Sequence, residues 1–527
     1  MKSFFSFLFL LPLFAFAQQY DVLITNGKIL DGTGNHWFYA DLAVKDGKII
    51  AIGKLKQQDA KRVIDAKGLM VAPGFIDVHT HIEGEEKRTP TAENFIYDGV
   101  TTVVTGNCGS SEVDMKTYFT FIDSLKTSIN IAALIGHNSV RRAVMGTARR
   151  DPSETEMQQM ILLVEEAMKN GAVGFSTGLI YIPGTYSKTE EVVKLAGAAA
   201  KYNGLYASHI RNEGDSVAVA IREAIQIGYL NKMPVEISHF KVSGQQNWGR
   251  SKETVAMIET ARRDGVDVTI DQYPYTASST SLGTLIPDEI LADGQDSIVA
   301  RLNRPDVRKY VIESMLKSLK KRKLKHFSYP VVANYRFDTT LNGKSIEQVN
   351  LIKGRKHKAS AEAETIIEMV INGGAQMVFH GMSEADVKRI MQYPFNMFAS
   401  DAGIRAFGSG VPHPRGYGTN ARVLAKYVRE ENVLTLEEAI RRMTSLPAQK
   451  FQLKDRGLLK EGMAADIVIF DAATVKDNST FEQPHQYSTG FSFVLVNGQI
   501  VVENGKHNGT RSGQGLKGPG FQLQTHQ

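Results

Sequence analysis

The feature that most constrains the fold is a long alternation of two kinds of segment between about residues 69 and 445. Short apolar runs with the composition of β-strands alternate with longer stretches of helical period, which predicts parallel strands joined by helical crossovers. Eight runs have strand character: Met70–His79, Val100–Val104, Asn130–Ile135, Val173–Ser176, Leu205–His209, Val235–His239, Val266–Asp271 and Phe395–Ser400. Eight strands with helices between them favour a closed (β/α)8 TIM-like barrel over an open sheet, and therefore an α/β fold.

Both flanks of this region are rich in short strand-like runs. Residues 18–68 and 451–527 carry them around the turn dipeptides Asn26-Gly27, Asp46-Gly47 and Asn497-Gly498, a pattern typical of β-hairpins. We expect the two flanks to meet in one small β-sandwich domain, with a polar tail at the end of the second. The barrel is then left to residues 69–450.

One part of the barrel region does not follow the alternation. It lies between the seventh and eighth strand-like runs, at about residues 283–376. We interpret it as an insertion in the barrel. Insertions of this kind usually lie over the face that carries the active site.

The first 17 residues have the pattern of a secretory signal peptide. Lys2 gives the positive start, the apolar run Phe4–Phe14 follows, and Ala15-Phe16-Ala17 is a small-x-small cleavage pattern. The run is too short to span a bilayer. We therefore expect cleavage after Ala17, export to the periplasm or medium, and no stable membrane anchor. The single cysteine, Cys108, excludes an internal disulfide.

The charge balance argues for a small anionic substrate rather than a nucleic acid. The net charge is +6 with a pI near 9.0, a mild bias for 527 residues. Basic residues interleaved with aromatics, the pattern of nucleic-acid binding, do not occur. The sequence leaves the oligomeric state open.

Potential metal ligands stand at the ends of several predicted strands. His79 and His81 are two residues apart at the first strand, so both imidazoles can point the same way. The others follow the second, fifth, sixth and eighth strands: Cys108, His209, His239 and Asp401. Barrels place their active sites at the carboxyl ends of the strands. Imidazole, thiolate and carboxylate together favour zinc over magnesium or calcium.

Several motifs resemble those of a known superfamily. "VAPGFIDVHTH" and "GLLKEGMAADIVIFD" are similar to the entry into and exit from the barrel of the amidohydrolase superfamily. "GVTTVVTGNCG", "GAVGFSTGL", "SHIRNE", "ISHFK", "QYPYTASST", "FASDAG" and "PHPRG" resemble its N-acyl-D-amino-acid deacylases, also called D-aminoacylases. The resemblance covers about residues 20–515. Many members bridge two metals with a lysine on the fourth strand, whereas this subgroup uses a cysteine from the second, and Cys108 stands there.

The resemblance implies zinc chemistry on this barrel. One zinc would be bound tightly by Cys108, His209 and His239, and His79 and His81 would hold or complete a second, weaker position. Asp401 would be the catalytic acid and base, taking a proton from the attacking water and passing it to the departing amine. The reaction would be hydrolysis of an N-acyl-D-amino acid to a carboxylate and a free D-amino acid.

The same resemblance assigns binding of the substrate carboxylate to Lys241, Tyr273, Ser279 and Arg415. Arg offers a bidentate fork for such a group. The chain departs from the family in one place, since Ile82-Glu83-Gly84 follows His-Thr-His where acidic residues usually come directly.

Two other functions remain open from the sequence. The first is another amide hydrolase of the superfamily, acting on a cyclic amide or an unusual dipeptide. Cys108 and the lack of a lysine in the fourth strand favour the deacylase instead. The second is a metal- or ligand-binding barrel without catalysis. Asp401 argues against this alternative, because a protein that only binds has no use for a general base.

Overall fold

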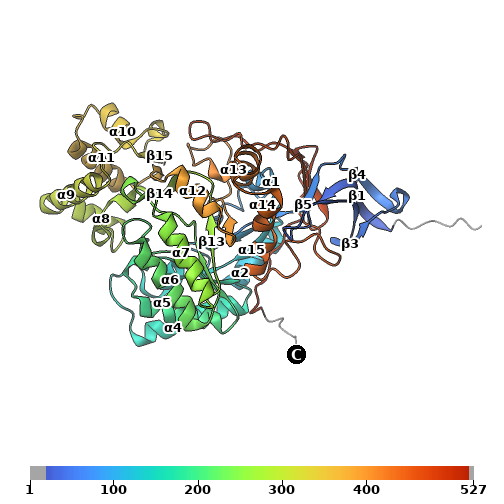
Figure 1. Ribbon diagram of the computed structural model, residues 1–527. Coiled ribbons are helices and arrows are strands. Elements are labelled where there is room, and N and C mark those ends of the chain that lie inside the picture. Colours follow the sequence, from blue (N-terminus) through green and yellow to red (C-terminus); the bar gives the residue numbers. More distant parts are fainter. Residues whose placement is uncertain (1–18, 522–527) are drawn as a thin grey trace, which may run out of the picture.

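The computed structural model describes residues 19–521, so the predicted signal peptide lies outside the described residues. Three parts can be followed in Figure 1: a barrel in the centre, a small β domain built from both ends of the chain, and a mainly helical insertion carrying α8 to α11. Within residues 19–521, the structure has no helix long and apolar enough to cross a membrane.

The central part is a closed barrel of parallel strands, which confirms the predicted fold class. β6 (Phe75–Asp77), β7 (Val100–Thr105) and β8 (Asn130–Ala133) pair in order, and β8 continues past Leu134 as β9 (Ile135–Gly136). From β9 the order continues through β10 (Gly174–Gly178), β11 (Leu205–His209), β12 (Val235–Ile237), β13 (Val268–Gln272) and β17 (Asn396–Phe398). A parallel bridge between Thr80 and Ala402 closes the ring beyond β6 and β17.

Side-chain alternation along these strands separates two cores. Ile76, Ala207 and Met397 come from strands on different sides of the ring and pack in one cluster, which therefore fills the barrel interior. The intervening residues, such as Tyr206 and Phe398, pack in the larger cluster with the surrounding helices.

The helices that cover the barrel follow their sequence signals. α4 (Glu154–Lys169) begins at a capping box between Ser153 and Glu156, and its buried stripe includes Met160 and Val164. The others are α1 (Glu93–Ile96), α2 (Met115–Leu125), α3 (His137–Met145), α5 (Thr189–Ala200), α6 (Val217–Asn231), α7 (Ser251–Arg263), α12 (Glu384–Met391), α13 (Arg415–Arg422), α14 (Leu436–Met443) and α15 (Ser445–Lys450). A π-helical turn, η7 (Val423–Glu430), continues α13, and the short 3-10 turns η2 (Gly184–Tyr186) and η3 (Gln245–Asn247) lie in loops.

The small domain joins the two ends of the chain in one nine-stranded sheet. Its strands are β1 (Tyr20–Ile29), β2 (Phe38–Lys45), β3 (Lys48–Gly53), β4 (Ala60–Asp65), β5 (Met70–Pro73), β18 (Ile467–Phe470), β19 (Phe491–Val496), β20 (Gln499–Glu503) and β21 (Lys506–His507), with η1 (Gln57–Asp59) before β4. β5 pairs with β1 on one side and β18 on the other, which unites the two segments. A bridge from Lys48 to Ala464 brings the free edge of β3 back against the C-terminal segment.

Two sequence expectations about this region were wrong in detail. Residues Met70–Pro73 belong to the small sheet, and the first barrel strand begins only at Phe75. Asn26-Gly27 does not turn the chain but lies at a register shift inside β1, where a Cβ on Gly27 would come within 2.7 Å of Val71. Asp46-Gly47 and Asn497-Gly498 do connect paired strands, β2 to β3 and β19 to β20.

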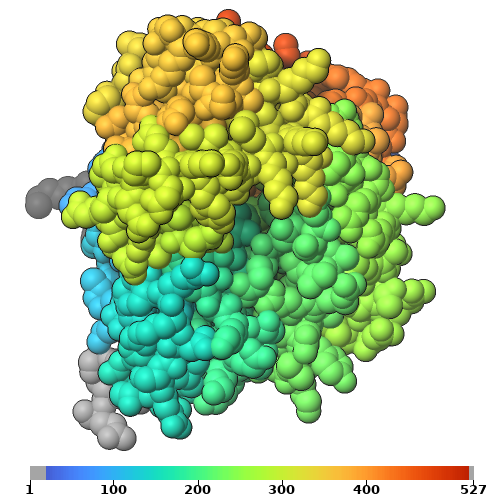
Figure 2. Space-filling model, turned by 90° about the vertical axis from the view of Figure 1, so that its left-hand side faces the viewer, coloured from blue at the N-terminus to red at the C-terminus, as the bar shows by residue number. Residues whose placement is uncertain are grey.

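The insertion follows β13 and has its own core. β14 (Ala277–Ser281), β15 (Pro330–Asn334) and β16 (Gln376–His380) form an antiparallel sheet. The 3-10 turns η4 (Leu282–Leu285), η5 (Asp288–Ile290) and η6 (Thr339–Leu341) and the helices α8 (Gln295–Leu302), α9 (Pro305–Lys321), α10 (Ile346–Ile352) and α11 (Ala359–Ile371) pack around it. Figure 2 shows this segment, in yellow, overhanging a hollow above the green part of the barrel.

Candidate metal centre and active site

All six strand-end residues come together at one end of the barrel. His209 ends β11, while the others stand in the short segments just after β6, β7, β12 and β17: His79, His81, Cys108, His239 and Asp401. Three overlapping groups of their donor atoms each lie within 4.8 Å of one another: His79, His81 and Cys108; Cys108, His209 and His239; and His79, His239 and Asp401. The convergence expected from the barrel is therefore present.

Cys108 is at the centre of the cluster. Its Sγ lies 3.3 Å from His79 Nε2, 3.6 Å from His209 Nδ1 and 3.5 Å from His239 Nε2. Burial raises the pKa of the Cys108 thiol and lowers the pKa of both His209 and His239 well below their usual range. Neutral imidazoles around a buried sulfur are the donor set of a zinc site, and zinc would stabilise the thiolate that burial alone disfavours. The residues thus fit the metal.

The backbone at this site is unusual and explains the "TGNCG" motif. Cys108, His239 and Asp401 have φ values of 51°, 36° and 49°, in the left-handed region that residues other than glycine rarely adopt. Gly106 also has a positive φ, and a Cβ there would lie 2.2 Å from the Leu134 carbonyl oxygen. The segment after β7 can place the sulfur only if a glycine stands at that position.

A buried aspartate that the sequence analysis did not single out orients two of the histidines. Asp271 Oδ2 lies 3.3 Å from His79 Nδ1, and Oδ1 accepts the His239 backbone N–H at 2.8 Å. Although burial would raise the pKa of Asp271, its interactions with His79 lower it. Carboxylates in this position fix the tautomer and orientation of metal-ligating histidines. Its place at the end of the seventh predicted strand is the signal that could have identified it.

Asp401 faces the cluster as a carboxylate between two histidines and Arg415. Oδ1 lies 3.2 Å from His81 Nε2 and 3.7 Å from His79 Nε2, and Oδ2 lies 2.9 Å from Arg415 Nη1. Burial alone would raise the pKa of Asp401, but Arg415 and the histidines together hold it well below its usual range. The group is therefore charged and able to accept a proton at neutral pH.

Glu213, in the "SHIRNE" motif, is a second residue that sequence reasoning missed. Its Oε1 lies 3.0 Å from His239 Nδ1 and 2.5 Å from Lys241 Nζ. Lys241 Nζ is also 2.8 Å from His239 Nδ1. Burial disfavours the charge on Lys241, but Glu213 outweighs it and raises the pKa of Lys241 to about 12. The motif alone could have pointed to this carboxylate.

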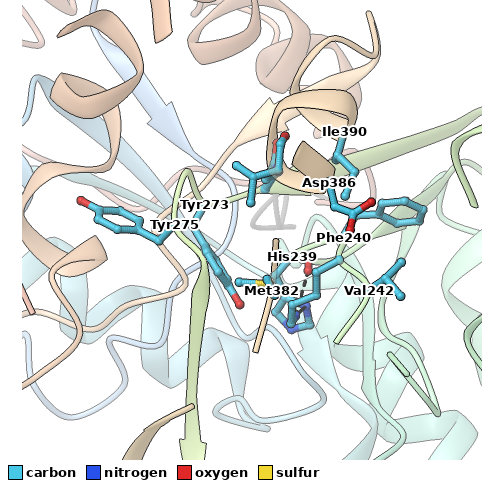
Figure 3. Close-up of a pocket in the computed structure, with 11 residues that line it drawn as sticks. His239, Phe240, Val242, Tyr273, Tyr275, Met382, Asp386 and Ile390 are labelled. Carbon is cyan, nitrogen blue, oxygen red and sulfur yellow. Dashed lines mark hydrogen bonds between the residues drawn. The ribbon is translucent and has the colours of Figure 1, made fainter. Parts of the chain in front are cut away.

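The structure divides the four predicted carboxylate-binding residues between two pockets. Ser279 and Arg415 line a cavity of about 610 Å³ that also contains His81, Cys108 and Asp401. Lys241 and Tyr273 instead line a separate and much smaller pocket, which shares no lining residue with that cavity and is shown in Figure 3 with His239 and Tyr273 labelled. The Tyr273 ring lies 4.5 Å from the Arg415 guanidinium and 5.5 Å from Lys241 Nζ, and its buried hydroxyl has no hydrogen-bond partner among the described residues.

The structure also gives a role to the residues after His-Thr-His. Ile82 is fully buried, and Glu83 Oε1 accepts hydrogen bonds of 2.6 Å from the Thr105 hydroxyl and the Gly106 N–H. Glu83 therefore binds the end of β7, just before Cys108, and supports the cysteine loop.

Known proteins resemble this chain in both sequence and fold. The family model described as "Amidohydrolase family" matches residues 62–286 and 341–502. A D-aminoacylase of Alcaligenes xylosoxydans xylosoxydans is 34% identical over 95% of this chain and 98% of its own length. A Bordetella bronchiseptica N-acyl-D-glutamate deacylase, solved with zinc and a phosphonate inhibitor, is 36% identical, covers 95% of this chain and 100% of its own, and has a TM-score of 0.81. A solved D-aminoacylase with a binuclear metal centre also has a TM-score of 0.81. It is 33% identical, and the match covers 94% of this chain and 100% of that one.

Proposed function

The chain belongs to the amidohydrolase family, and from this membership we propose that it hydrolyses the amide bond of N-acyl-D-amino acids, giving a carboxylate and a free D-amino acid. One observation carries the proposal. A sulfur surrounded by three imidazoles opens, together with a charged aspartate, onto a cavity of about 610 Å³. Two relatives that are 34% and 36% identical and each cover 95% of this chain are a D-aminoacylase and an N-acyl-D-glutamate deacylase.

The donor set supports zinc as the cofactor. Cys108, His209 and His239 would hold a tightly bound ion, and His79 and His81 would hold or complete a second, weaker position. Bound there, zinc would polarise the substrate carbonyl and lower the pKa of a water molecule toward neutrality. Asp271 would fix the ring of His79 through Nδ1 and hold the backbone of His239, whose ring Nδ1 lies against Glu213.

Asp401 would move the proton. Its carboxylate is charged at neutral pH and lies at the edge of the cavity beside the histidines, so it can accept the proton of the attacking water. The same oxygen then gives that proton to the nitrogen of the departing amine, which leaves as a neutral group. Arg415 and His81 hold the carboxylate in place during both transfers.

The cavity supports a small anionic substrate. Arg415 and Ser279 face it directly, and Arg88, Arg336 and Arg405 also contribute to its lining. The substrate carboxylate would lie against Arg415 and Ser279, with the Tyr273 hydroxyl and Lys241 behind them. Because Arg415 already pairs with Asp401, the substrate would share this arginine with the catalytic carboxylate rather than replace it.

A panel of substrates tests the proposal. Purified protein with zinc should release free amino acid from N-acetyl-D-amino acids with neutral and acidic side chains, measured with a D-amino-acid oxidase assay. A hydantoin and a dihydropyrimidine represent the alternative, a cyclic amide hydrolase. Turnover of the cyclic amides without turnover of any N-acyl-D-amino acid would overturn the proposal.

We also propose that residues 1–17 direct export. Lys2, the apolar run and Ala15-Phe16-Ala17 support it, as the pattern of a cleavable signal. N-terminal sequencing of protein from a periplasmic fraction should read from Gln18. Recovery only from the cytoplasm, with Met1 still present, would refute this part.

A further inference from the structure

A second group of potential metal ligands lies in the insertion, apart from the barrel site. Its members are His326, Glu347, His357 and Glu362, and one donor atom from each lies within 4.8 Å of all the others. They come from three segments: the chain before β15, helix α10, and the start of α11 with the loop before it. No role in the proposed reaction uses them.

The geometry centres on two stacked imidazoles and two carboxylates. The rings of His326 and His357 have centroids 4.1 Å apart and an interplanar angle of 24°. His326 Nδ1 lies 2.6 Å from Glu362 Oε1 and 3.9 Å from Glu347 Oε1, while His357 Nε2 lies 2.6 Å from Glu347 Oε1. Two nitrogens and two oxygens therefore face one small volume.

The electrostatics favour a cation in that volume. The Glu362 side chain is fully buried, and its second oxygen accepts the Phe327 N–H at 2.7 Å. Lys353 and Arg355, which precede His357 in the chain, form ion pairs with Glu368 and not with Glu347 or Glu362. Among the described residues, the ion pairs of Glu347 and Glu362 are made to the two imidazoles. A buried carboxylate needs such compensation.

The spacing fits a tetrahedral ion after a small adjustment. Zinc bonds of about 2.0–2.1 Å to nitrogen and oxygen place neighbouring donor atoms roughly 3.3 Å apart. The two contacts of 2.6 Å would lengthen and the one of 3.9 Å would shorten. Because His357 is 52% exposed and His326 28%, both rings have room to move, while Glu362 is fixed.

We propose that these four residues form a structural zinc site in the insertion. The ion would fasten α10 and α11 to the segment that leads into β15, where Glu347 N already donates to the Phe327 carbonyl at 3.1 Å. β15 ends at Asn334, and Asn334 and Arg336 line the active-site cavity. The site thus supports the wall of that cavity without touching the reacting atoms, and it does not depend on the proposed function.

Zinc analysis of the full-length protein tests the site. Cys108→Ala removes the sulfur of the barrel centre, so metal retained by that variant reports mainly on other positions. We expect Cys108→Ala/His357→Gln to hold one zinc fewer per chain than Cys108→Ala. His36→Gln in the same background is the matched control, because His36 forms a similar exposed contact of 2.7 Å with one carboxylate, Glu437, and should change nothing. Equal zinc in all three proteins would overturn the proposal and leave a hydrogen-bonded ion-pair cluster.

Thermal unfolding gives a second measurement, in which each variant is compared with itself in the absence and presence of zinc. Cys108→Ala stripped with a chelator should gain melting temperature when zinc is added back, because a ligand that binds only the folded state stabilises it. The gain should be lost in Cys108→Ala/His357→Gln and kept in the His36→Gln control. No gain in Cys108→Ala itself would also overturn the proposal. Release of D-amino acids plays no part in either measurement, so failure of the proposed function would be seen separately.

Discussion

Replacing Asp401 by asparagine isolates the proton transfer from the metal chemistry. The amide is nearly the same size and can keep contact with His81 and Arg415, now 3.2 and 2.9 Å from the two carboxylate oxygens. It has no negative charge and cannot accept a proton from water. We therefore expect zinc content to remain close to that of the unaltered protein while turnover falls.

The size of the loss follows from the role. General acid–base groups contribute about 10²- to 10⁴-fold to rate, which is about 2.7 to 5.4 kcal/mol at roughly 1.36 kcal/mol per decade. Because the pKa of Asp401 lies well below its usual range, the carboxylate is the resting form at pH 7 and the full loss should be seen there. The assay is kcat for an N-acetyl-D-amino acid, with zinc measured on the same sample.

A matched change controls for loss of a buried carboxylate as such. Asp466 is also buried, but it bonds Arg456 and Asn130 near the start of β8, at the opposite end of the barrel. Asp466→Asn should lower the free energy of unfolding. Its kcat should stay within about twofold of that of the unaltered protein, a small change because about 1.36 kcal/mol corresponds to tenfold in rate. Unchanged kcat in Asp401→Asn with normal zinc would refute the assignment of Asp401 as the base.

Three further outcomes are expected. Cys108→Ala should lose the tightly bound zinc and activity together, checked by elemental analysis and turnover; full zinc and full activity would exclude it as a ligand. Arg415→Met and Lys241→Met should lower kcat/KM for acid substrates about ten- to a hundredfold more than for the matching amides, since a hydrogen bond to a charged group contributes about 1.5–3 kcal/mol; equal losses would disprove carboxylate binding. Burial lowers the pKa of Lys450 to about 8, so between about pH 8 and 10.5 the unfolded chain binds more protons and stability gains with rising pH. Lys450→Met should reduce that gain in urea unfolding at pH 8 and 10, and an unchanged slope would contradict the shift.

The sequence predicted the barrel because period and residue type agree along most of its length. It erred at Met70–Pro73 because one apolar run serves two neighbours: β5 pairs in the small sheet, and β6 begins two residues later in the barrel. Periodicity cannot place that change of partner, which is decided by contacts with β1 and β18, far away in sequence. Asn26-Gly27 shows the same limit. The pair is typical of a turn, but in the structure Gly27 allows Val71 of β5 to lie close to the backbone of β1.

The candidate site was predictable where position alone decides. His79, Cys108 and His209 stand at strand ends, and strand ends of a barrel converge. Pairings between side chains were not predictable, because they depend on distances across the ring. The reach of Glu213 to His239 and Lys241 is an example. Another is the left-handed backbone at His239. It follows the end of β12 at Ile237, so strand alternation does not continue to Lys241.

The central claim is tested most directly by the stereochemistry of the substrate. The zinc-loaded protein should be assayed with matched pairs of N-acetyl-D- and N-acetyl-L-amino acids, following release of the free amino acid, before and after removal of the metal by a chelator. We predict hydrolysis of the D member of each pair at least a hundredfold faster in kcat/KM, about 2.7 kcal/mol, lost with the metal and restored by zinc. Equal hydrolysis of both enantiomers, or turnover that survives complete removal of the metal, would contradict the account.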